Sequence, residues 1–168
     1  MESIVSGLLE AVPIPRVARV RQRFPDEHIP ADRLPDHILG LLAQKGVAAG
    51  IRPGMKIALT AGSRGIRNIP LLLGTLVRFV RDCGGEPYLV AAMGSHGGAT
   101  SRGQREVLAG LGITEETVGC PIRSGMEVVP AGRNAEGVQV YMSRDAAQAD
   151  GVIVCNRIKP HTCFRGPC

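Results

Sequence analysis

The chain has 168 residues, of which 44% are hydrophobic, and this is enough core material to exclude an intrinsically disordered chain. Its formal net charge of +5 does not by itself indicate nucleic acid, and aromatic residues at 3% are too few for the stacking surfaces that hold single strands, so we expect no nucleic-acid partner. No apolar run reaches the roughly 18–20 residues of a membrane span, so we also expect no membrane partner and a cytoplasmic location.

The first predicted elements are a strand, a helix and a second strand. Residues 16–24 alternate arginine with apolar side chains, which predicts an edge strand with one solvated face. Apolar residues at helical spacing over 34–47 predict an amphipathic helix. The nearly continuous apolar run at 56–60 predicts a strand that is covered on both faces.

From residue 61 onward the sequence repeats strand, glycine-bearing loop and helix. Helices are predicted at 69–82, from a capping box at 101–104, and at 144–149, with strands at 88–92 and 151–155 and a hairpin over 128–141. This alternation predicts a single α/β domain over 1–168. We expect a mostly parallel Rossmann-like sheet with helices on both faces and a small β-hairpin. In such folds ligands bind beyond the carboxyl ends of the strands.

The first loop at that edge, residues 62–68 (GSRGIRN), is a candidate anion site. Arg64 and Arg67 carry planar guanidinium groups that match a carboxylate or phosphate, and Ser63 lies between them and the preceding strand. The glycines of the loop would let backbone N–H groups approach an anion as well. A merely solvated loop is the alternative.

The second and third loops each bring a histidine to the same edge. Residues 94–100 (GSHGGAT) place Ser95, His96 and Gly97 just before a helix N-terminus, where anions are attracted and a near-neutral imidazole can exchange a proton. Lys159 and His161 follow the last strand. For each histidine the alternative is an ordinary surface residue.

The five cysteines indicate free thiols. Their number is odd and they include no C-x-x-C pair, which favours neither a disulfide framework nor a zinc knuckle. Cys163 and Cys168 lie close to His161, but one histidine with two thiols five residues apart is a weak metal signal. We therefore expect no metal ligands in this chain.

Taken together, residues 62–68, 94–100 and 156–162 (NRIKPHT) resemble the N-terminal domain of the nickel-pincer-dependent lactate racemase family, over about residues 16–166. The resemblance implies an isomerase that acts on a small 2-hydroxy acid with a nickel-pincer nucleotide as cofactor. It implies that His96 and His161 are a catalytic acid and base pair. It also implies that Arg67 holds the substrate carboxylate or a cofactor phosphate, among anion-binding residues that include Ser63, Arg64, Ser95, Gly97 and Lys159.

The chain also departs from the family pattern. Arg64 stands where lactate racemases have an aspartate, so the resemblance is to an uncharacterised branch. The family's cofactor-tethering lysine, nickel-ligating histidine and second domain would follow the third loop, and Lys159 precedes His161 and does not match the tether. We expect a truncated domain that is inactive alone and self-associates through an exposed cleft side. The alternative is a non-catalytic nucleotide- or anion-binding module.

Overall fold

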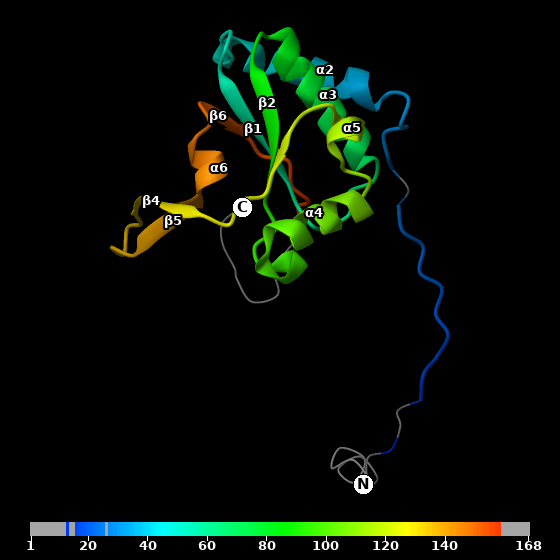
Figure 1. Cartoon of the computed structure of the whole chain (residues 1–168). Helices are drawn as coiled ribbons and strands as arrows, with labels where there is room; N and C mark the ends of the chain where they lie inside the picture. The colour runs from blue at the N-terminus through cyan, green and yellow to red at the C-terminus, as the bar shows by residue number, and fades with distance from the viewer. Residues whose placement is uncertain (1–12, 14–15, 26, 159–168) are drawn as a thin grey trace.

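A computed structural model describes residues 13, 16–25 and 27–158, and its centre is a four-stranded parallel sheet in the order β3-β2-β1-β6 (Figure 1). The strands of this sheet are β1 (Lys56–Ala61), β2 (Glu86–Ala91), β3 (Ile122–Arg123) and β6 (Gly151–Ile153). A separate antiparallel hairpin consists of β4 (Val128–Arg133) and β5 (Gln139–Ser143). The predicted α/β class, with its parallel sheet and hairpin, is confirmed.

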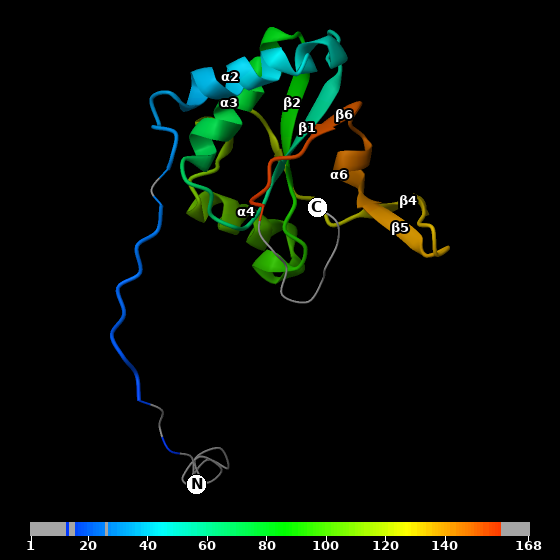
Figure 2. The ribbon, with the colours of Figure 1, turned by 180° about the vertical axis from the view of Figure 1, so that it is seen from behind.

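Helices lie on both faces of the parallel sheet, unequally, as Figures 1 and 2 show. They are α2 (Leu34–Gln44), the 3-10 helix η1 (Val47–Gly50), α3 (Ile69–Asp82), the 3-10 helix η2 (His96–Ala99), α4 (Ser101–Gly110), α5 (Glu115–Val118) and α6 (Arg144–Ala147). The main core contains Leu59 and Leu89 of the central strands with Leu73 of α3 and Leu108 of α4. On the opposite face the smaller cluster around Tyr88 is packed against α6 and the residues after it.

The predicted edge strand at 16–24 is wrong. Among the described residues this segment pairs with no strand, and Val17, Val20 and Phe24 are exposed. Alternation of apolar and polar side chains gives a strand only where another strand edge offers hydrogen bonds. The two edge strands of the sheet, β3 and β6, have only two and three residues respectively, so little edge is available.

The prediction of a buried last strand also needs correction. The strand ends earlier than expected, as β6, and Val152 remains 41% exposed. Because β6 lies at the edge of the sheet, next to β1 only, it has no neighbour on its outer side within the described residues. The residues after it, including Val154 at 68% exposure, belong to no strand.

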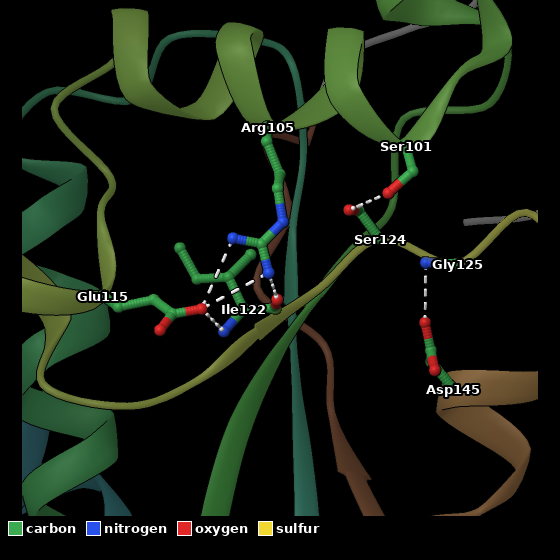
Figure 3. A network of polar contacts seen from close by, with 7 residues as sticks. All are labelled: Ser101, Arg105, Glu115, Ile122, Ser124, Gly125 and Asp145. Atoms are coloured by element: carbon green, nitrogen blue, oxygen red, sulfur yellow. Dashed lines mark hydrogen bonds and ion pairs between the residues drawn. The ribbon is translucent and has the colours of Figure 1, made fainter.

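Two short elements that the sequence did not reveal, α5 and β3, are fixed by a polar network (Figure 3). The Glu115 carboxylate accepts hydrogen bonds from the Ile122 N–H at 3.0 Å and from the Arg105 guanidinium at 3.3 Å. Arg105 also donates to the Ile122 carbonyl. These contacts hold β3 beside β2 although β3 is too short to pair strongly by itself.

The segment between β3 and β4 is held in place by two contacts. The hydroxyls of Ser101 and Ser124 lie 2.8 Å apart, and the Gly125 N–H donates to the Asp145 carboxylate at 2.8 Å (Figure 3). These contacts connect the segment between β3 and β4 to α4 through Ser101 and to α6 through Asp145. Among the helices in the described part of the chain, none is long and apolar enough to cross a membrane.

Candidate anion-binding site

The loops after β1, β2 and β6 meet at Gly62. A Cβ built on Gly62 would lie 3.6 Å from Oδ1 of Asn156, which follows β6, and 3.7 Å from the carbonyl oxygen of Ala92, which follows β2. These are ordinary contact distances, so three segments that are far apart in sequence touch at one point. The site lies at the carboxyl edge of the parallel strands, where folds of this class bind ligands.

A cavity of about 90 Å³ lies at this meeting point. Its polar lining comes from Ser63, Arg64, Asn156 and Arg157, and its apolar lining includes Ile66 and Ile69. Pockets that enclose a whole drug-sized ligand are typically about 300–1,000 Å³. The cavity is therefore suited to a single phosphate or carboxylate group and is too small to enclose a nucleotide.

The charges around the cavity favour an anion. Arg157 donates to the Gly65 carbonyl at 3.2 Å and so ties the third loop to the first. Neither Arg64 nor Arg67 forms an ion pair with any described residue, so neither guanidinium is neutralised by a carboxylate there. An incoming carboxylate or phosphate would accept hydrogen bonds from Arg64 without first displacing a partner from the described part of the chain.

Cys155 contributes to the cavity wall as a neutral group. Its N–H donates to the Thr60 hydroxyl oxygen at 2.9 Å, and its carbonyl accepts from the same hydroxyl at 3.3 Å. Burial raises the pKa of the Cys155 thiol. The thiol therefore stays protonated at neutral pH and adds no negative charge that would oppose an anion.

The second loop is held against α4 by two glycines. Gly97 has φ +68°, and a Cβ on it would lie 2.4 Å from the carbonyl carbon of Gly103; a Cβ on Gly103 would lie 1.9 Å from the Gly97 oxygen. No side chain fits at either position. The Gln104 amide also donates to the Gly94 carbonyl at 2.9 Å. Gly97, predicted to bind an anion, thus has a structural reason to be glycine.

The predicted capping box at 101–104 is wrong, because the cap lies one residue earlier and consists of one hydrogen bond. Thr100 is the N-cap of α4, and its hydroxyl oxygen accepts from the Gly103 N–H at 3.1 Å. Thr100 has the extended backbone, φ −124° and ψ 147°, that an N-cap needs. The side chains of Ser101 and Gln104 bond elsewhere, to Ser124 and Gly94.

The predicted site residues are only partly brought together. Ser63 and Arg64 line the cavity, whereas Arg67, Ser95, His96 and Gly97 do not. The imidazole of His96 is exposed and forms no hydrogen bond with a described residue. Lys159 and His161 lie outside the described residues. Within the described ranges, no group of His, Cys, Asp and Glu side chains is arranged to hold a metal ion.

The sequence placed Asn156 and Arg157 in the third loop at this edge but did not mark them as site residues, and it did not single out Cys155 as a lining residue. Their position in the sequence could have indicated them, because residues directly after a parallel strand lie at the carboxyl edge of the sheet. No family model, curated protein or solved structure matches this chain. The resemblance to lactate racemases thus remains a prediction, carried by three motifs and by the meeting of their loops.

Proposed function

We propose that this chain supplies the anion-binding part of the active site of a 2-hydroxy acid racemase or epimerase related to the nickel-pincer lactate racemases. The meeting of three motif-bearing loops at Gly62 supports it most strongly. Arg64 would bind the carboxylate of the substrate or a phosphate of the cofactor. The proposed setting is the cytoplasm, and the proposed substrate is a small 2-hydroxy acid.

The cavity fits part of the nickel-pincer nucleotide. Ser63, Arg64 and Asn156 offer donors for one phosphate, while a volume of about 90 Å³ leaves the rest of the nucleotide outside this cavity. When bound, the pincer would supply the hydride acceptor that breaking a non-acidic C–H bond requires. The residues of this chain would bind and orient the anionic groups and handle the proton.

Proton handling falls to the histidines. Oxidation of a 2-hydroxy acid to the ketone requires a base for the hydroxyl proton, and reduction requires the proton to return. The exposed imidazole of His96 would exchange that proton on one face of the substrate, and His161 on the other. Arg67, exposed in the first loop, would steer the carboxylate toward the cavity.

The alternative, a non-catalytic anion- or nucleotide-binding module, has an observation of its own. His96 does not line the cavity, so among the described residues the anion site has no imidazole in its wall. A module of this kind would bind phosphate-bearing ligands through Arg64 and would catalyse nothing. The two functions share the anion site, but only the racemase requires His96, for proton transfer.

Calorimetry and a racemisation assay distinguish the racemase from the non-catalytic binding module. We expect L-lactate or pyrophosphate to bind the chain, and Arg64→Ala to weaken that binding by about tenfold or more, since a hydrogen bond to a charged group contributes roughly 1.5–3 kcal/mol. Arg78→Ala is the control, because Arg78 is exposed on α3 away from the cavity. Equal affinity of wild type and Arg64→Ala would refute the anion site.

For catalysis, this domain is joined to the second domain that the resemblance implies and is produced in cells that make the pincer, and conversion of L- to D-lactate is measured together with nickel content. Racemisation that His96→Gln abolishes, with lactate affinity unchanged, is the expected result. Binding without racemisation in a nickel-loaded preparation would favour the non-catalytic module. Racemisation that His96→Gln leaves intact would refute the role of His96.

A further inference from the structure

The hairpin of β4 and β5 extends away from the parallel sheet and exposes apolar side chains. It forms a sheet of its own, joined to the rest of the fold next to α6 (Figures 1 and 2). On β5, Val140, Tyr141 and Met142 are 43%, 62% and 42% exposed. A two-stranded hairpin alone in water is marginally stable, and an edge strand without charge is open to pairing with another strand.

The register of the hairpin shows which backbone groups β5 presents outward. Met142 lies opposite Val129, and the Arg144 N–H donates to the Glu127 carbonyl at 2.9 Å. Hydrogen-bonded and non-hydrogen-bonded positions alternate along an antiparallel strand. The amide groups of Arg144 and Met142 therefore face β4, and those of Tyr141 face away. No described strand pairs with this outer edge.

The two edges of the hairpin differ. Pro130 lies opposite Tyr141, so its nitrogen also faces outward, and proline offers no N–H there. The register of β4 shifts between Pro130 and Gly132, which interrupts the same edge. β4 is thus protected against pairing, whereas β5, with the sequence QVYMS, has neither proline nor charge. Only β5 can accept a further strand along its whole length.

The edge of β5 is complementary to itself. In an antiparallel pair of two β5 strands centred on Tyr141, the two Tyr141 residues would exchange both of their backbone hydrogen bonds. Val140 would lie opposite the partner's Met142, and Gln139 opposite the partner's Ser143. Apolar side chains would face apolar ones and polar side chains polar ones, with no like charges opposed.

We propose that β5 is a self-association edge, through which two copies of this chain pair about a twofold axis and merge their hairpins into one four-stranded antiparallel sheet. The centre of complementarity at Tyr141 argues for a second copy, because a twofold interface must present the same surface from both sides. This interface is distinct from the loop edge of the parallel sheet, and it does not depend on the proposed function.

Sedimentation equilibrium of the full chain tests the proposal. We expect a dimer with a dissociation constant on the order of 10–100 µM, as suits a small interface. V140K/M142K places like charges across the pairing and is expected to weaken the dimer by about tenfold or more. V140K/M142E removes the same apolar side chains but opposes unlike charges, and is expected to restore much of the association.

Two further variants make the test specific. V128K alters an exposed valine on β4, outside the pairing, and should leave the dimer unchanged. Tyr141→Pro removes the outward N–H without removing a bond to β4, and should dissociate the dimer. Circular dichroism checks that each variant is folded. A wild-type chain that is monomeric at about 1 mM, or a dimer that V140K/M142K leaves intact, would overturn the proposal.

Discussion

Replacing Gly103 by alanine tests how the His96 loop is positioned. In a helix interior, glycine to alanine is usually stabilising by about 0.4–1 kcal/mol, because the unfolded chain loses freedom. At Gly103 we expect the opposite sign. The new Cβ would lie 1.9 Å from the Gly97 carbonyl oxygen and 2.9 Å from the Thr100 hydroxyl oxygen, both short of the 3.0 Å that real Cβ contacts reach.

The size of the expected stability loss depends on how far the Gly97 carbonyl must move. The Gly97 oxygen has to retreat by about 1 Å, and its backbone is tied to α4 through a 3.0 Å hydrogen bond from the Thr100 hydroxyl. Forcing an extra carbon into a packed contact costs about 1–3 kcal/mol. The expected net effect of Gly103→Ala is a loss of about 1–2 kcal/mol in the free energy of unfolding, with displacement of the loop that carries His96.

Gly110, the last residue of the same helix, provides the control. A Cβ there meets nothing within 4 Å, so Gly110→Ala should be neutral or stabilising by up to about 1 kcal/mol. Urea denaturation gives both free energies, and the imidazole resonances of His96 report the displacement by NMR. If Gly103→Ala is as stable as Gly110→Ala and leaves those resonances in place, the close packing of η2 on α4 is refuted.

The remaining predictions concern the β3 anchor and a buried thiol. Glu115→Ala should lower the free energy of unfolding in urea by about 1.5–3 kcal/mol, since it removes the acceptor for Ile122 and Arg105. Glu115→Gln keeps an acceptor oxygen and should lower that free energy by less than half as much. Equal losses for the two variants would contradict the role of the acceptor. Burial raises the pKa of the Cys120 thiol from 9.0 to about 11. The folded state therefore holds a proton that the unfolded state releases first, and stability should fall as pH rises from about 9 to about 11. Thermal unfolding over this range measures the fall, and Cys120→Ala should reduce it without abolishing it, because burial also raises the pKa of the Cys155 thiol; an unchanged slope would show that other groups cause it.

The sequence predicted those elements whose signals are local. Helix α3 begins and ends where its apolar periodicity and the glycines after it indicate, and the buried runs at β1 and β2 were recognised as strands. β3 was missed because two residues carry no periodicity, and its place depends on contacts from Glu115 and Arg105. The alternation of arginine and apolar side chains at 16–24 wrongly predicted a strand, because a pattern within one segment does not show whether another strand edge is available for pairing.

The candidate site was predictable at the level of backbone but not of side chains. Parallel topology alone places the residues after each strand at one edge, and their contact at Gly62 agrees with this. Whether a side chain reaches the cavity depends on how each loop is folded. The loop of His96 is set by the Gly97–Gly103 contact and by Gln104, and such tertiary contacts have no sequence signature.

The position of β6 affects the order in which the cavity can form. β6 pairs with β1 although it comes from the far end of the described chain, and the Lys56 N–H donates to the Asp150 carboxylate across a separation of 94 residues. During synthesis β1, α3 and β2 emerge first and can associate locally, as low-separation contacts form fastest. The wall provided by Cys155, Asn156 and Arg157 is synthesised after the walls from the first two loops, so the anion site can form only after β6 has been synthesised.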